Sequence, residues 1–124
     1  MNKLLSGLLV LAGIIHLLPL PGVFGADRLL ALYGVPLQDA NLIILMRHRA
    51  VLFGLLGGFL IYAAFKPVLQ PTAFIAGLIS VVSFLLIAWS VGEYNDAVRN
   101  IVIADAVALI ALLVAAACSR FRPL

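Results

Sequence analysis

Charged residues are scarce in this sequence. Only 10% of its 124 residues are Asp, Glu, Lys or Arg, whereas 65% are hydrophobic. Soluble globular domains contain about a quarter charged residues and about half apolar ones. Because a soluble core of this size could not enclose so much apolar surface, the composition predicts an integral membrane protein.

Cysteine and histidine are also scarce. Cys118 is the only cysteine, which excludes thiol–disulfide chemistry between two cysteines of one chain. His16 and His48 are the only histidines, so no Cys/His cluster suits zinc. A bis-histidine haem needs both residues on facing helices at matched depth, and His48 lies near the predicted membrane rim. We therefore predict no metal and no cofactor.

Motifs for catalysis and nucleic-acid binding are missing as well. The sequence has no Gly-rich phosphate loop and no Walker-type sequence, so no enzymatic activity is predicted. Its eight basic and five acidic residues give a net charge of +3. The cations are scattered at segment ends, as in membrane proteins, and form no patch with aromatic residues. Nucleic acid is therefore not an expected partner.

Long hydrophobic runs are what the sequence does contain. A membrane-spanning helix needs roughly 20 apolar residues, because about 30 Å of hydrocarbon is crossed at about 1.5 Å per residue. Four stretches are long enough: residues 4–24, 41–65, 71–92 and 97–119. Since connections 66–70 and 93–96 are short, the last three helices should be antiparallel neighbours. We predict an all-α fold, with one four-helix transmembrane domain over residues 1–124.

The segment between the first two spans is longer. Pro19 and Pro21 should bend or end the first helix. Residues 26–33 have the pattern of a short amphipathic helix, which Gly34 and Pro36 should stop. We expect this helix to lie in the plane of the membrane interface.

Two further expectations concern processing and orientation. Residues 1–25 could instead be a cleaved signal peptide, although three later spans favour a retained helix. Four cations and no acid lie on the side of the chain termini: Lys3, Lys66, Arg120 and Arg122. The opposite side combines all the acids with the remaining four arginines: Arg28, Arg47, Arg49, Arg99, Asp27, Asp39, Glu93, Asp96 and Asp105. If Arg47 and Arg49 are partly buried, the distribution predicts cytoplasmic termini.

Ionisable residues inside apolar spans are the best candidates for a functional site, because they are costly there. At 1.5 Å per residue, Asp105 and His16 lie about 12 Å inside the predicted outer ends of their helices, and Arg47 about 8 Å. We predict a buried polar cluster of Asp105, Arg47 and His16, which could also be a proton or ligand site. Three other ionisable residues near the same membrane edge are secondary candidates: His48, Arg49 and Glu93.

Small residues predict where helices pack closely. Gly54 and Gly58 have the spacing that lets two membrane helices approach each other. At about 100° per residue, Arg47 lies within about 20° of the line through these glycines. Arg47 should therefore point into the bundle. Alternatively, Arg47 and Arg49 extend to the membrane interface, because residues 50–65 span only about 24 Å.

Three runs carry a resemblance to a known group of proteins: ALYG at 31–34, MRHRAVLFG at 46–54 and AD at 104–105. They resemble small bacterial four-helix inner-membrane proteins, broadly similar to DoxX-like proteins, whose function is not known. Some such sequences are labelled phosphopantetheine adenylyltransferase. The soluble enzyme of that name has a Rossmann-like fold and a Gly-His-containing nucleotide motif. Here GIIH at 13–16 lies inside a predicted membrane helix, so that activity is not expected.

Three functional hypotheses remain open on the sequence. The first is an inner-membrane protein of unassigned biochemical role, with lipid as its surroundings, in which the polar cluster holds the helices together. The second is a small proton-coupled transporter that titrates Asp105 and acts as a homo-oligomer, because one bundle leaves little room for a pathway. The third is an accessory subunit of a quinone or respiratory membrane complex. The sequence identifies no small-molecule ligand.

Overall fold

The computed structural model describes residues 3–35 and 38–120, and within this part of the chain all regular structure is helical. The elements follow in chain order: α1 (Lys3–Leu17), η1 (Leu20–Phe24), α2 (Ala26–Tyr33), α3 (Ala40–Ala64), η2 (Pro67–Leu69), α4 (Gln70–Val91) and α5 (Asp96–Arg120). Four long helices and one short helix between the first two are present. The predicted all-α four-helix bundle is therefore confirmed.

The first predicted span consists of two segments rather than one helix. The α-helix ends at Leu17, just before Pro19 and Pro21, which have no backbone N–H to continue its hydrogen bonds. The chain goes on as the 3-10 helix η1, where the Gly22 N–H donates to the Pro19 carbonyl oxygen at 2.9 Å. The expected effect of the two prolines is confirmed.

The short helix α2 has the predicted bounds. Gly25 before it has a φ of +129°, a conformation that glycine adopts without a steric penalty, and the chain turns there. Gly34 ends the helix at a φ of +69°, with its N–H donating to the Leu30 carbonyl oxygen. The second predicted stop, Pro36, lies outside the described residues.

Side-chain caps explain where α3 and α5 begin. The Asp39 carboxylate accepts a hydrogen bond from the Asn41 N–H at 2.8 Å. The Asn95 amide oxygen accepts one from the Val98 N–H, also at 2.8 Å, as expected of a capping residue. The helices α3 and α5 therefore begin at residues 40 and 96, each within one residue of the predicted start.

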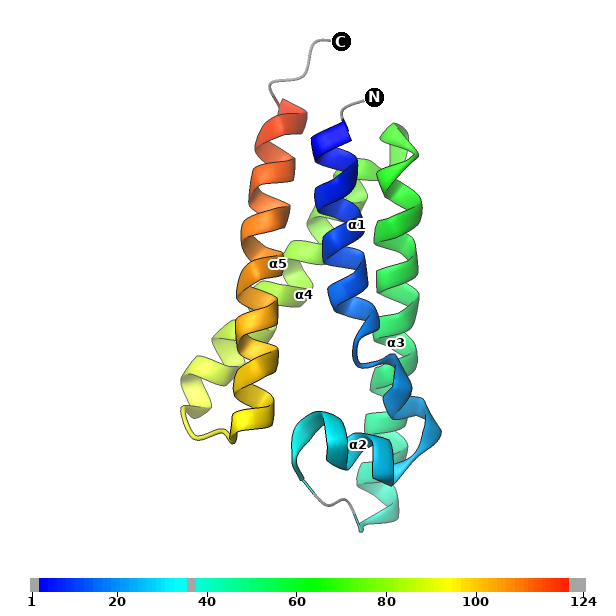
Figure 1. Cartoon of the computed structure of the whole chain (residues 1–124), viewed down its shortest axis with the longest axis vertical. Helices are drawn as coiled ribbons and strands as arrows, with labels where there is room; N and C mark the ends of the chain where they lie inside the picture. The colour runs from blue at the N-terminus through cyan, green and yellow to red at the C-terminus, as the bar shows by residue number, and fades with distance from the viewer. Residues whose placement is uncertain (1–2, 36–37, 121–124) are drawn as a thin grey trace.

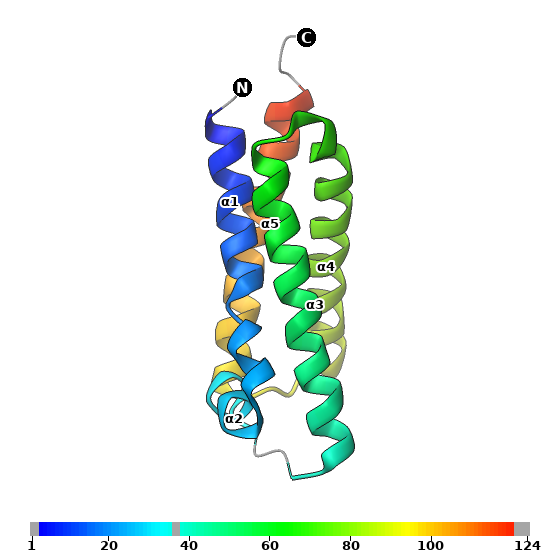
Figure 2. The ribbon, with the colours of Figure 1, turned by 90° about the vertical axis from the view of Figure 1, so that its right-hand side faces the viewer.

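The long helices form a closed ring in the order α1, α3, α4, α5. The α1 helix lies between α3 and α5, and α4 contacts the same two helices from the other side (Figure 1). The start of α1 and the end of α5 lie at one end of the bundle, and α2 lies at the opposite end (Figure 2). Contacts of α3 with α4 and of α4 with α5 confirm the predicted neighbours.

Close helix packing occurs at a glycine pair other than the one predicted. A Cβ atom added at Gly57 would lie 2.7 Å from the Gly13 carbonyl oxygen, and one at Gly13 would lie 2.8 Å from that of Gly57. Both glycines therefore let the backbones of α1 and α3 touch. Gly54 is also tightly packed, against the Leu20 side chain, but Gly58 has nothing within 4 Å. The prediction was wrong for Gly58, which lies on the outer surface.

The outer surface of the bundle is apolar. Large hydrophobic side chains such as Ile75, Ile79 and Leu86 are exposed along one helix, α4. Four helical segments are long and apolar enough to cross a membrane: Lys3–Phe24, Ala40–Ala64, Pro67–Val91 and Asp96–Ser119. Exposed apolar surface of this extent is unfavourable in water but not in lipid. The structure thus has the features of a multi-pass membrane protein.

Candidate functional site

His16 lies at the centre of a polar contact between α1 and α4. The side chain is 3% exposed, and its Nδ1 lies 2.7 Å from the Ala12 carbonyl oxygen, which can only accept a hydrogen bond. Its Nε2 lies 3.0 Å from the Ser80 hydroxyl oxygen. In neutral imidazole Nε2 accepts from this hydroxyl, and in imidazolium it donates to the same oxygen. Ser80 can therefore satisfy both protonation states of His16.

Asp105 is the buried acid of the site. Its side chain on α5 is 8% exposed. Within the part of the chain that the structure describes, the carboxylate accepts no hydrogen bond and forms no close ion pair. Arg49 is near enough for its positive charge to act on Asp105. A buried carboxyl group without a donor is costly, so its presence requires a functional or solvent-based explanation.

Arg49 contacts aromatic side chains in addition to its electrostatic interaction with Asp105. Its Nη1 donates a hydrogen bond to the Tyr33 hydroxyl. The guanidinium carbon lies 4.4 Å from the ring centre of Phe53 and 5.2 Å from that of Tyr33. Cation–π contacts of this kind stabilise a guanidinium group that has left water. Arg49 is therefore stabilised without a direct bond to Asp105.

Tyr33 brings the short helix α2 into the site. Burial raises the pKa of its phenol, and the nearby charge of Arg49 opposes this shift. The neutral phenol remains a hydrogen-bond acceptor for Arg49. The Tyr33 carbonyl oxygen also accepts a hydrogen bond from the Asn95 side-chain amide at 2.8 Å. Asn95 thus caps α5 and ties it to the end of α2.

A small cavity lies beside His16, Arg49 and Asp105. Its volume is about 40 Å³, and it lies between residues of α1, α3, α5 and the segment before η1: Ile15, His16, Leu18, Pro19, Arg49, Phe53, Ile101, Ala104 and Asp105. A polar cavity needs roughly 10–15 Å³ of space for the centre of a probe before it can hold one water molecule. The cavity therefore has room for a water molecule next to the carboxyl group, but not for an organic solute.

A larger hollow lies next to the cavity, towards the end of the bundle where α2 lies. Its volume is about 320 Å³, and it lies between α2 and α5, lined by Leu18, Ala31, Leu32, Ala97, Asn100, Ile101 and Ala104. Leu18, Ile101 and Ala104 line both spaces. The hollow beside α2 and the cavity at Asp105 therefore share a wall.

Of the predicted cluster, the structure brings His16 and Asp105 to one cavity, and it places Arg47 elsewhere. The Arg47 side chain is exposed, and its Nε donates to the Val23 carbonyl oxygen at 2.8 Å. Two residues correspond to about 200° around a helix, so Arg47 and Arg49 point in nearly opposite directions. The line through Arg47 and Gly54 faces η1, not the interior, and Arg49 takes the inner position.

The other secondary candidates lie outside the site. His48 is exposed and lines a surface groove with Arg47, Val23, Ile44 and Val51. Glu93 is exposed in the loop before α5. Neither residue lines the cavity at Asp105.

Tyr33 and Phe53 belong to the site but were not predicted from the sequence. A signal for Phe53 was present, because Arg49, Phe53 and Gly57 follow one another at intervals of four residues and share a helix face. Tyr33 had no such signal, because α2 is far from α3 in any local pattern. Ser80 was recognisable only as a small hydroxyl in an apolar span.

No protein-family model, no curated protein and no solved structure matches this chain. The resemblance to DoxX-like proteins therefore stays a prediction. Among the described residues, no group of three or more His, Cys, Asp or Glu side chains is placed to hold a metal ion.

Proposed function

We propose that this chain is a small proton-coupled protein of the bacterial inner membrane, in which Asp105 exchanges a proton with the aqueous side next to α2. The observation that carries the proposal is the position of Asp105. It is a buried carboxyl group with no donor among the described residues, and it faces a cavity with room for a water molecule. Such groups in membrane proteins typically mark ion or proton pathways.

The surroundings of Arg49 favour proton exchange over a purely structural ion pair. If Arg49 depended on Asp105, neutralising the acid would leave a buried cation without a partner. Here the Tyr33 hydroxyl and the Phe53 ring hold the guanidinium group independently. Asp105 can therefore gain or lose a proton while Arg49 keeps its contacts.

His16 supplies a second proton-carrying group on the same cavity. Its Nε2 contacts a hydroxyl that serves both protonation states, so a change of state requires only a rotation of the Ser80 hydroxyl proton. A water molecule in the cavity would lie beside both His16 and Asp105. The larger hollow beside α2 offers the connection to the aqueous phase.

The cavity at Asp105 measures only about 40 Å³, which is too small for an organic solute. If a solute is transported together with protons, its pathway would lie between copies of the chain. The proposal therefore includes a homo-oligomer.

The proposed orientation places both termini in the cytoplasm. Among the described residues, Lys3 and Lys66 lie at the end where α1 begins, and all acids lie elsewhere. Reporter fusions after Leu124 and in the loop 93–95 test this orientation. The expected result is a cytoplasmic signal for the first fusion and a periplasmic signal for the second, and the reverse pattern would contradict it.

The test of proton exchange compares Asp105→Asn with Asp96→Asn, which removes an exposed acid from the same helix. Each full-length protein is placed in liposomes, and proton flux under an imposed pH gradient is followed with an internal pH dye. We expect flux above that of empty liposomes for the original chain and Asp96→Asn, and none for Asp105→Asn. Infrared spectroscopy should also show a protonated carboxyl band that depends on pH and disappears in Asp105→Asn.

Two results would overturn the proposal. Equal flux in the original chain and Asp105→Asn would show that another route carries the protons. A carboxyl band that is independent of pH, together with no flux above empty liposomes, would mean that Asp105 serves only the architecture of the bundle.

A further inference from the structure

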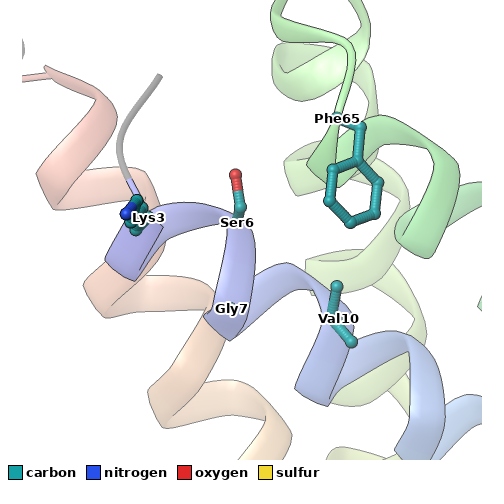
Figure 3. A pocket seen from close by; sticks show the side chains of 5 residues that line it. All are labelled: Lys3, Ser6, Gly7, Val10 and Phe65. Carbon is teal, nitrogen blue, oxygen red and sulfur yellow. The ribbon is translucent and has the colours of Figure 1, made fainter.

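An open groove lies at the end of the bundle opposite α2. Its volume is about 640 Å³, and it is lined by Lys3, Ser6, Gly7 and Val10 of α1 and by Phe65, which follows α3 (Figure 3). The Ser6 hydroxyl donates to the Ala64 carbonyl oxygen at 2.7 Å. Its proton is therefore already engaged within the protein, and the wall below Lys3 is apolar.

Gly7 and Phe65 give the groove its shape. A Cβ atom at Gly7 would meet nothing within 4 Å, so the missing side chain leaves open space on the surface of α1. The Phe65 ring stands on the other side of this space and is 57% exposed (Figure 3). A flexible hydrocarbon chain fits such a surface, because contact with an apolar wall requires no hydrogen-bonding partner.

The positive charge at one end of the groove favours a hydrocarbon ligand with an anionic group. Lys3 lies at the first turn of α1, and Lys66 directly follows Phe65. Every acid in the sequence lies elsewhere, at positions 27, 39, 93, 96 and 105. A cation at the membrane boundary beside an apolar surface attracts an anionic headgroup.

We propose that this groove binds an anionic phospholipid, with the phosphate on the Lys3 ammonium group and an acyl chain along Gly7, Val10 and Phe65. The site is distinct from the polar cavity at Asp105 and shares no lining residue with it. The proposal is independent of proton exchange.

A second copy of the chain is the main competing occupant. A symmetric dimer through this groove would bring the same surface of both copies together. It would bring the two exposed Lys3 ammonium groups together at the membrane boundary, where like charges repel each other. An anionic lipid instead neutralises Lys3, so the charge favours lipid.

The test uses the full-length protein in a neutral detergent, with phosphatidylglycerol or phosphatidylcholine added, and counts retained lipid by native mass spectrometry. Gly7→Leu fills the groove. Gly58→Leu is the matched control, because Gly58 also has nothing within 4 Å but lies on a different helix surface. Lys3→Gln removes the headgroup contact, and Arg99→Gln removes an exposed cation at the other end of the bundle.

We expect one phosphatidylglycerol to be retained in preference to phosphatidylcholine. Gly7→Leu should abolish this binding and Lys3→Gln should weaken it about fivefold, which corresponds to the attraction of one juxtamembrane cation. Both controls should bind as the original chain does. Equal retention of the two lipids would refute the headgroup contact, and unchanged binding in Gly7→Leu would place the lipid elsewhere. A dimer that Gly7→Leu dissociates would show that a second copy occupies the groove.

Discussion

The two halves of the bundle are packed by different kinds of residues. The half near the start of α1 contains the main hydrophobic core, built from aliphatic, aromatic and alanine side chains: Leu5, Leu9, Ala12, Leu60, Ala63, Ala64, Ala73, Phe74, Val81, Ala108, Leu112 and Ala115. The half near α2 contains the buried His16 and Asp105. The buried polar residues of the first half, Ser6 and Gln70, are uncharged and donate to backbone carbonyl oxygens. The elements η1 and α2 lie at this end of the bundle (Figure 1), and the small cavity at Asp105 lies between α1, α3 and α5.

The residues that determine the stability of the bundle therefore differ from those that could take part in proton exchange. The apolar half depends on shape, since Gly13 and Gly57 leave no room for a side chain. The polar half depends on specific contacts, such as that between Arg49 and Tyr33. Substitutions in the first half should therefore act on folding, and those in the second on smaller local energies and on protonation.

The largest effect is expected for Gly57→Leu. Its side chain would collide with the backbone of α1, which cannot rotate away as a side chain can, and the free energy of unfolding should fall by about 3 kcal/mol. Thermal unfolding in detergent, followed by loss of the monodisperse chromatographic peak, measures the change. The control Gly58→Leu should unfold at the temperature of the original chain. Equal stability of both variants would contradict the close approach of α1 and α3.

A smaller loss is expected for Arg49→Gln. The substitution removes the hydrogen bond to Tyr33 and the contacts with two aromatic rings, which together contribute about 2 kcal/mol. Arg47→Gln should cost no more than about 0.5 kcal/mol, because Arg47 is exposed. The same detergent assay compares the two. A larger effect for Arg47 would reverse the assignment of the inner arginine.

The next effect concerns the contact between α2 and α5. Asn95→Ala removes both the cap of α5 and the hydrogen bond to the Tyr33 carbonyl oxygen, at a cost of about 1 kcal/mol. Hydrogen exchange should then become faster in α2 as well as at the start of α5. Asn100→Ala, an exposed change in the same helix, should leave α2 unaffected. Faster exchange in α5 alone would mean that Asn95 is only a cap.

The smallest effect is a dependence of stability on alkaline pH. Because burial raises the pKa of Tyr33, the folded state favours the protonated phenol. The resulting stabilisation is complete below the ordinary pKa of tyrosine and is lost as pH rises through the higher folded value. Ultraviolet titration of tyrosinate, as the difference between the original chain and Tyr33→Phe, isolates this residue. Tyr94→Phe is the exposed control. A difference curve with an ordinary or lowered midpoint would contradict the burial of the phenol.

Local sequence signals predicted most of the fold. Pro19 and Gly34 act through their own backbone, so the ends of α1 and α2 could be located without knowledge of packing. The depth of His16 and Asp105 followed from counting residues along a helix. Both residues line the polar cavity.

The choice between Arg47 and Arg49 could not be made in this way. Helical periodicity gives the angle between two side chains but not which of them faces the interior. That direction depends on η1, whose Leu20 packs against Gly54 and occupies the side of α3 that carries Arg47. The position of η1 in turn follows from the break after α1. For the same reason the pairing of Gly13 with Gly57 was not apparent, although both residues are glycines in apolar runs.

The link from Asn95 to Tyr33 has a consequence for the order of assembly during synthesis. Chains fold from the amino-terminal side as they emerge, so Tyr33 is available before Arg49 is made. The arginine can therefore meet its phenol partner as soon as α3 is inserted. Asn95 and Asp105 arrive only with the last helix. A chain that ends before α5 would contain Arg49 bound to Tyr33, but it would lack Asp105 and the hydrogen bond from Asn95 to α2. Insertion of α5 therefore completes the polar site in a single step.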